Sequence, residues 1–223
     1  MTSKRGDRSM FEGIFWDNDG VLMETELLYY RANAEALAGV GVELTREEFC
    51  RISLQRGESV LALGSGERSE EKEQELRRVR DEIYFRLLGE EARVIPGIRQ
   101  TLELLHGRLP MAIVTSCRRE NFLRMHRQSG LLDFFDFVLT REDYGASKPD
   151  PEPYLAACAR AGLDPSRCLA IEDSQRGVIA AARAGLAVAA IPGELNAGGD
   201  FSAARWLLEG IGQLPPILGL KPV

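Results

Sequence analysis

The chain has 223 residues, of which 44% are hydrophobic and 28% charged, and it carries a formal net charge of −6 at pH 7. This length suffices for one sizeable hydrophobic core and a small second unit. No apolar run reaches the ~20 residues of a membrane-spanning helix, and the negative charge argues against a nucleic-acid-binding face. The four cysteines form no C-x-x-C pair, so reduced, mostly buried thiols and a cytoplasmic location are expected.

The first informative segment is the apolar run 14–16, which is followed by Asp17, Asp19 and Gly20. The run predicts a short buried strand, and the glycine predicts a tight turn at its end. If strand geometry continues through Asp19, both carboxylates project to the same side, because side chains alternate along a strand. Such a pair suits a hard cation such as Mg²⁺. Taken alone, a polar turn after a strand explains this motif equally well.

Residues 23–93 show helical patterns throughout. A first helix is expected over 25–37, where glycines follow as stop signals. A second helix is expected to open at Thr45, because Glu48 stands three residues later, as in a capping box. A long charged helix is expected to start at Glu70. Since no strand pattern is convincing in this stretch, the sequence predicts an all-helical insert.

Beyond the insert, polar residues again follow short apolar runs or precede helices. In an open parallel α/β sheet, the carboxyl ends of the strands meet in one crevice, where ligands bind. The helix N-termini at that crevice favour anions such as phosphate. The clusters are Thr115-Ser116 after the run 111–114, Lys148 just before a helix start at Asp150, and Glu172-Asp173 after the run 168–171.

Each cluster also has an ordinary structural explanation. Thr115 and Ser116 are typical helix-capping residues, and Lys148 is typical of a solvated loop. Glu172-Asp173 would favour the positive end of the following helix. The ordered set, with each cluster at a junction between elements, is what favours one shared site.

The sequence resembles the haloacid dehalogenase superfamily, in its branch of phosphatases and phosphomutases with a small helical cap, from about Phe11 to about Ile191. The resemblance implies an α/β fold, with a Rossmann-like parallel sheet core of residues 11–22 and 94–223 and helices on both faces. It also implies an all-helical cap domain at 23–93, and residues 1–10 are expected to be a flexible leader. The four signature motifs of the family match Asp17 with Asp19, Thr115, Lys148, and Glu172 with Asp173.

The resemblance implies a phosphoric monoester hydrolase that uses Mg²⁺ and forms an aspartyl-phosphate. Asp17 would be the nucleophile. Asp19 would be the general acid that protonates the leaving group and then the base that activates water. The ion would be held by Asp17, the backbone carbonyl of Asp19 and Asp173. Glu172 would either bind the ion or orient its water, and the sequence leaves both roles open.

The phosphate group would be bound by residues of the middle motifs. Thr115, with the Ser116 N–H, would bind a phosphate oxygen, and Lys148 would neutralise charge shared by the phosphoryl group and the nucleophile. The expected partner is a small phosphorylated metabolite such as a sugar phosphate, with no nucleic acid and no membrane, and the chain is expected to be a monomer or weak homodimer. His106 and His126 lie on predicted helices without ligand-like spacing, so both are expected to be structural.

Substrate specificity is less sharply encoded. Arg56 in the insert, and Arg118 or Arg119 after the second motif, are candidates to bind a further anionic group, because a guanidinium suits bidentate contact. A plain surface arginine is the alternative at these positions. Relatives that are β-phosphoglucomutases carry a histidine where this chain has Tyr29. This difference favours a phosphatase, and a hexose-phosphate mutase is the alternative. A non-catalytic phosphometabolite-binding protein is the alternative of another class.

Overall fold

The computed structural model describes residues 10–65 and 70–221. The expected leader at 1–10 therefore lies outside the described residues, apart from Met10. Within the described residues, no helix is both long enough and apolar enough to cross a membrane.

A six-stranded parallel sheet forms the centre of the larger part of the molecule. Its strands are β1 (Gly13–Trp16), β4 (Met111–Val114), β5 (Phe137–Leu139), β6 (Cys168–Glu172), β7 (Ala187–Ala190) and β8 (Trp206–Leu207). They lie in the order β5-β4-β1-β6-β7-β8. Every residue of β1, β4 and β6 is buried, as expected for short apolar strands that are covered on both faces.

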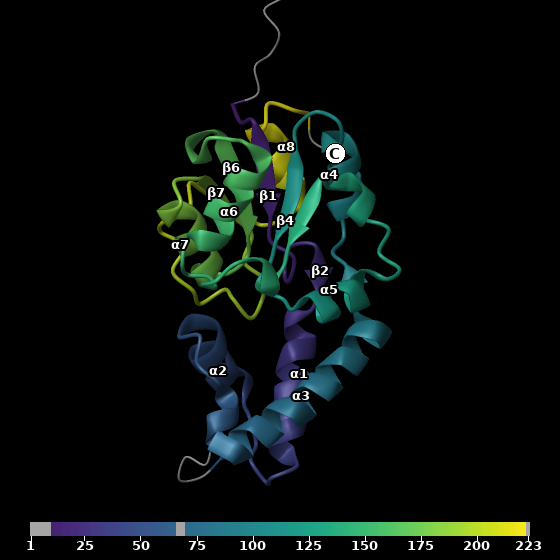
Figure 1. Ribbon diagram of the computed structural model, residues 1–223, viewed down its shortest axis with the longest axis vertical. Helices are drawn as coiled ribbons and strands as arrows, with labels where there is room; N and C mark the ends of the chain where they lie inside the picture. The colour runs from purple at the N-terminus through teal and green to yellow at the C-terminus, as the bar shows by residue number, and fades with distance from the viewer. Residues whose placement is uncertain (1–9, 66–69, 222–223) are drawn as a thin grey trace, which may run out of the picture.

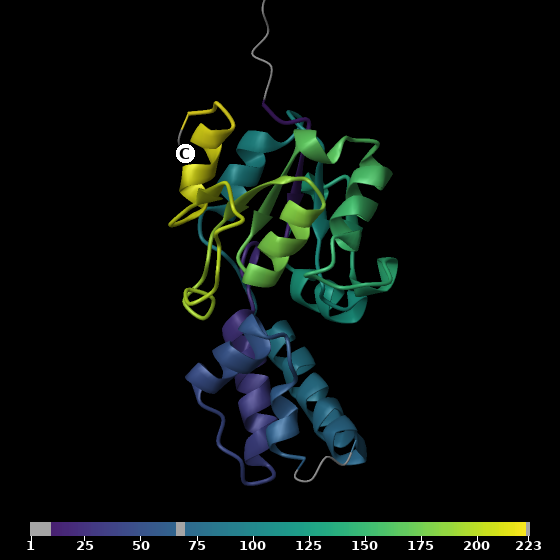
Figure 2. The same ribbon diagram turned by 90° about the vertical axis from the view of Figure 1, so that its left-hand side faces the viewer.

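Helices cover both faces of this sheet (Figure 2), which confirms the predicted α/β class. Ile14 and Trp16 of β1 belong to one apolar cluster and Phe15 to the other, because successive side chains point to opposite faces. The first cluster packs under α4 (Ile98–Leu105), α5 (Arg119–His126) and α8 (Leu214–Ile217), and the second under α6 (Glu152–Ala161) and α7 (Gln175–Arg183). One-turn helices η3 (Leu132–Phe134), η4 (Arg141–Asp143), η5 (Pro165–Arg167) and η6 (Ile211–Gln213) lie in the connections.

The segment between β2 (Met23–Glu24) and β3 (Arg93–Val94) gathers at one end of the sheet (Figure 1). Its helices are α1 (Glu26–Ala38), α2 (Arg46–Phe49), a π-helical turn η1 (Cys50–Gln55), a 3₁₀ turn η2 (Val60–Leu63) and α3 (Glu70–Glu91). They share an apolar cluster of their own that includes Leu37, Phe49 and Leu61. The predicted capping box is present, because the Thr45 side chain accepts from the Glu48 N–H and the Thr45 N–H donates to Glu48.

Two very short strands carry the chain into and out of this helical segment. β2 (Met23–Glu24) and β3 (Arg93–Val94) form an antiparallel pair, with Met23 opposite Val94. The sequence did not predict them, because a strand of two residues is too short to show an alternating pattern. Between β2 and β3, the described residues form helices and no strands, as expected.

The register of the sheet brings three strand ends to one level. Trp16 pairs with Ile113 on one side and with Ile171 on the other. The residues that follow these three strands therefore lie at the same edge, which is the edge facing the helical segment (Figure 1). A single crevice is thus built from parts of the chain that are more than 150 residues apart.

Candidate active site

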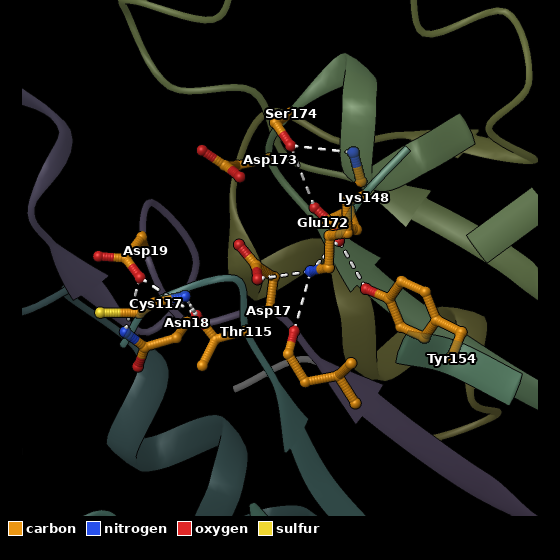
Figure 3. A network of polar contacts seen from close by, with 12 residues as sticks. Asp17, Asn18, Asp19, Thr115, Cys117, Lys148, Tyr154, Glu172, Asp173 and Ser174 are labelled. Carbon is orange, nitrogen blue, oxygen red and sulfur yellow. Dashed lines mark hydrogen bonds and ion pairs between the residues drawn. The ribbon is translucent and has the colours of Figure 1, made fainter. Parts of the chain in front are cut away.

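A cleft of about 470 Å³ lies between the carboxyl edge of the sheet and the helical segment. The sheet side contributes Asp17, Asp19, Thr115, Ser116, Lys148 and Asp173, and the helical segment contributes Tyr29, Asn33, Arg77, Arg80 and Tyr84. Seven of the candidate residues from the sequence, these six of the sheet side and Arg118, are therefore brought together in one cavity. Figure 3 shows how the polar groups at the strand ends are arranged.

Lys148 connects several groups on the buried side of the site (Figure 3). Its Nζ donates to Asp17 Oδ1 at 2.7 Å, to Glu172 Oε1 at 2.7 Å and to the carbonyl of Val114 at 2.9 Å. These three acceptors use all the protons of an ammonium group. Burial by itself would lower the pKa of Lys148, but the two carboxylates hold it well above its ordinary value, so the group is charged.

Glu172 is completely buried behind this lysine. Its Oε1 accepts from the Tyr154 hydroxyl at 2.6 Å as well as from Lys148, and its Oε2 accepts from Ser174 at 3.4 Å. Gly177 makes room for it, because a Cβ at that position would lie 1.9 Å from Glu172 Oε2. The structure thus gives Glu172 a role in holding Lys148, which the sequence had not indicated.

β1 ends at Trp16, so the strand does not continue through Asp19, contrary to the geometry considered from the sequence. Asp19 lies in the following turn, where it forms only an isolated bridge with Met23. The two aspartates nevertheless both line the cleft, with different partners (Figure 3). Asp19 accepts from Thr25 at 2.6 Å, from Thr115 at 3.3 Å and from Tyr84 at 3.4 Å.

Asp173, which follows β6, is held by a second group of side chains. Its Oδ2 accepts from Asn196 at 2.8 Å, and the same amide also donates to Glu26. Burial raises the pKa of Asp173 well above its ordinary value, and Glu26 and Asp17 raise it further. Burial likewise raises the pKa of Glu26 to about 7. Neither Glu26 nor Asn196 was singled out from the sequence.

These carboxylates form a donor set that fits a hard divalent cation. Asp17, Glu172 and Asp173 each offer an oxygen, and the three atoms lie within 4.8 Å of one another. Burial raises the pKa of Asp17 to about 8 even though Lys148 lowers it. When all three carboxyl groups are ionised, the single positive charge of Lys148 does not balance them. A buried cluster of carboxylate oxygens with excess negative charge suits Mg²⁺.

Thr115 and Ser116 both line the cleft. The Thr115 hydroxyl accepts from the Cys117 N–H at 3.0 Å and donates to Asp19, so it does not cap α5, whose N-cap is Arg118. Ser174 caps α7, because its hydroxyl accepts from the Gly177 N–H.

Two of the predicted substrate residues are not in the cleft. Arg119 pairs with Asp143 at 2.6 Å, and Arg56 lies 3.9 Å from Glu58 on the surface. Neither residue is among those that line the cavity. Arg119 begins α5, and its side chain packs toward η4, where Asp143 lies, whereas Arg118 lines the cleft.

His126 was expected to be merely structural, but it is connected to the site. Its Nε2 lies 2.7 Å from Asn18 Oδ1, and Asn18 Nδ2 donates to Asp19 at 3.1 Å. The signal in the sequence was an asparagine between the two aspartates, at the end of an otherwise apolar strand. Its partner could not be identified there, because Asn18 and His126 are 108 positions apart.

Comparison with known proteins defines the class of this enzyme. Residues 14–191 match the family described as haloacid dehalogenase-like hydrolase. The chain therefore belongs to the haloacid dehalogenase-like hydrolases, and its relatives place it among the phosphatases of that family.

Individual relatives extend over most of the chain. Protein CbbY of Rhodobacter capsulatus is 30% identical over 210 residues, which are 87% of this chain and 91% of that protein. Phosphorylated carbohydrates phosphatase of Thermotoga maritima is 32% identical over 181 residues, or 78% of this chain and 82% of that protein. The crystal structure of a CbbY mutant from Rhodobacter sphaeroides in complex with xylulose-(1,5)bisphosphate is similar with a TM-score of 0.80 at 27% identity, covering 93% of this chain and 99% of that one.

Proposed function

We propose that this protein is a Mg²⁺-dependent phosphatase that hydrolyses a small phosphorylated carbohydrate through an aspartyl-phosphate on Asp17. The observation that carries the proposal is the buried ion pair of Asp17 with Lys148, together with an Asp173 carboxylate oxygen within 4.8 Å of one of Asp17. The proposed substrate class is supported by the names of two relatives, one a phosphatase of phosphorylated carbohydrates and the other bound to a sugar bisphosphate.

The chemistry assigns one task to each carboxylate. Asp17 attacks phosphorus, and the bond from phosphorus to the leaving oxygen breaks as Asp19 gives that oxygen a proton. Asp19 then takes a proton from water as the water attacks the aspartyl-phosphate, which releases phosphate and restores Asp17. Lys148 favours the ionised form of Asp17 and fixes its orientation, because Lys148 Nζ donates to Asp17 Oδ1 while two other acceptors hold the ammonium group in place.

A divalent cation completes the site in this proposal. Asp17, the backbone carbonyl of Asp19 and Asp173 would hold Mg²⁺, which would neutralise the carboxylates and the phosphoryl oxygens. Glu172 acts through Lys148 and Tyr154, which occupy one of its oxygens. Thr115 and Ser116, which line the cleft, would bind a phosphate oxygen.

The helical segment is the proposed cap domain, with boundaries at about residues 23 and 93. It supplies Arg77 and Arg80 to the cleft, while Arg118 and Arg176 come from the sheet side. Four guanidinium groups around one cavity suit an anionic sugar phosphate. Closing the cavity against bulk water strengthens the electrostatic interactions within it.

The test is phosphate release from 4-nitrophenyl phosphate and a panel of sugar phosphates, with and without Mg²⁺. We expect Mg²⁺-dependent activity in the wild type and a loss of at least ~1000-fold in Asp17→Asn, because the amide cannot form the acyl phosphate. The matched control is Asp133→Asn, the same change at an exposed position on η3. Circular dichroism would confirm that both variants fold.

Three results would contradict the proposal in different ways. Equal activity of Asp17→Asn and wild type would remove Asp17 from its role. A wild type inactive on the whole panel would favour a phosphometabolite-binding protein. An isomeric sugar phosphate as product, in place of free phosphate, would favour a mutase.

A further inference from the structure

Asn18 is a buried polar residue that the proposed reaction does not use. It stands between Asp17 and Asp19 and is completely inaccessible to solvent. Its backbone carbonyl already accepts from the N–H groups of Val21, Leu22 and Met23, so the turn does not depend on its side chain. Burial of an amide is unfavourable unless it is hydrogen-bonded. The contacts of the side chain therefore indicate what it contributes.

All polar atoms of the Asn18 side chain have partners. Its Nδ2 donates to Asp19 Oδ2 at 3.1 Å and lies 3.0 Å from the sulfur of Met125, while its Oδ1 is 2.7 Å from His126 Nε2. If the amide were turned over, its oxygen would face the Asp19 carboxylate and both acceptors would repel. The contact of Oδ1 with His126 therefore fixes the amide so that its Nδ2, and not its oxygen, faces Asp19.

His126 is in turn oriented by Ser129. Burial lowers the pKa of His126 to about 4, so at neutral pH the ring has one donor and one acceptor nitrogen. Ser129 Oγ lies 2.8 Å from His126 Nδ1 but 3.3 Å from the His126 carbonyl, and it accepts from the Leu131 N–H. The hydroxyl therefore donates its single proton in a hydrogen bond to His126 Nδ1, which is the acceptor nitrogen of the ring. Nε2 must then carry the ring proton and donate to Asn18.

We propose that Asn18 and His126 are positioning residues, which present one N–H donor to Asp19 Oδ2 and so fix the orientation of this carboxyl group. The proposal rests on the proposed role of Asp19 as general acid and base. Three side chains from other elements hold Asp19 as well: Thr25, Tyr84 and Thr115. Asn18 is distinct among these contacts, because its own orientation is set by a chain of hydrogen bonds that runs through His126 to Ser129.

The kinetic test compares two kinds of leaving group. A general acid matters for an alkyl phosphate, whose leaving alkoxide needs a proton, and much less for 4-nitrophenyl phosphate. The parameter is kcat/KM, which reports the steps up to phosphoenzyme formation. For Asn18→Leu we expect kcat/KM to fall about tenfold with a sugar phosphate, the loss that one hydrogen bond to a charged group supports, and by less than about threefold with 4-nitrophenyl phosphate.

A pair of variants at His126 makes the test independent of the first variant. His126→Phe keeps a ring against Phe122 but removes the donor, so it is expected to behave like Asn18→Leu. His126→Gln keeps an N–H that can reach Asn18, and it is expected to restore most of the activity on the sugar phosphate. The control for stability is Thr101→Val, which removes a buried hydroxyl bonded to the Gly97 carbonyl on α4. Its ratio of kcat/KM values should equal that of the wild type.

The hydrogen bonds themselves can be observed without activity. Nitrogen-15 NMR of the His126 ring should show the proton on Nε2 in the wild type. A ring protonated on Nδ1 would overturn the proposal, as would equal losses on both substrates in Asn18→Leu and His126→Phe. A wild type inactive on every ester would overturn the proposed function and the positioning role with it. An active wild type with unchanged ratios in the variants would overturn the positioning role alone.

Discussion

At the scale of single residues, the site is organised by sharing each charged group between several partners. Lys148 joins Asp17 to Glu172, and Asn196 joins Asp173 to Glu26. Each connecting side chain donates to two carboxyl groups that would otherwise repel each other. A pair of carboxyl groups is thus joined by a shared donor twice in this site, once by an ammonium group and once by a neutral amide.

The neutral connection predicts an effect on metal affinity. In Asn196→Ala, Asp173 loses its donor and its fixed orientation, so the Mg²⁺ concentration for half-maximal activity should rise about 10- to 100-fold. The maximal rate at saturating Mg²⁺ should change much less, because Asn196 does not take part in the chemical steps. The measurement is a Mg²⁺ titration of phosphate release.

The control for this variant is Gln55→Ala, which removes another contact to the same loop, from Gln55 Nε2 to the carbonyl of Gly198. It should leave the Mg²⁺ titration unchanged. A similar shift in both variants would mean that loop anchoring, and not the contact with Asp173, controls metal affinity.

At the scale of elements, the turn after β1 decides how closely the strand ends approach. Gly20 has a φ of +79°, which favours glycine, and it packs directly against Asp173 at the end of β6. Thr25, which precedes α1, uses its hydroxyl on Asp19 and makes no capping hydrogen bond with its helix. The elements that leave the sheet here therefore also position the edge that carries the proposed active site.

A pair of glycines separates backbone strain from this close approach. A Cβ at Gly20 would lie 2.0 Å from Asp173 Oδ2, whereas a Cβ at Gly107, which has a similar φ of +73°, would meet nothing within 4 Å. We expect Gly20→Ala to lower kcat/KM about 100-fold, because Asp173 or the turn must move by about 1 Å. Gly107→Ala should lose only about 1 kcal/mol of stability and keep its activity.

The two variants are compared by steady-state kinetics and by urea unfolding. Wild-type kcat/KM in Gly20→Ala would show that the contact with Asp173 is not needed at its present distance. A large loss of activity in Gly107→Ala would show that backbone strain alone, far from the cleft, disturbs the site.

At the scale of the whole molecule, folding buries three carboxyl groups with raised pKa values around one cavity. The pKa of Asp17 is raised to about 8 and that of Glu26 to about 7, and that of Asp173 is raised as well, all mainly by burial. Between about pH 4 and pH 8, the folded state then binds more protons than the unfolded state. The free energy of unfolding of the metal-free protein should therefore fall as the pH rises through this window.

A bound cation should counteract this loss. Mg²⁺ requires ionised carboxylates, so it binds more tightly at high pH and releases protons as it binds. At a fixed concentration that equals 100 times its Kd at pH 8, Mg²⁺ should add about 2.7 kcal/mol at that pH, or roughly 5–10 °C in Tm for a chain of this size. We expect the increase to be larger at pH 8 than at pH 5.5 in thermal unfolding, and to be lost in Asp173→Asn. An increase that is equal at both pH values would contradict the buried carboxylates as the metal site.

The sequence by itself determined the local features that neighbouring residues encode. The apolar runs gave β1, β4 and β6, the Thr45 capping box began α2, and polar residues at the strand ends marked the core of the site. These features depend on propensity and spacing within a few residues, and so they can be read without a structure. The resemblance to a known family added the role expected of each polar residue at these strand ends.

Only the tertiary structure decided which distant side chains meet. Asn196 reaches Asp173, Tyr84 reaches Asp19 and His126 reaches Asn18 through packing of helices and loops that lie far apart in the chain. The same packing turned Arg119 toward Asp143 and left Arg118 in the cleft. The direction of a side chain on a short helix or in a loop depends on what packs against it, and no local pattern contains that information.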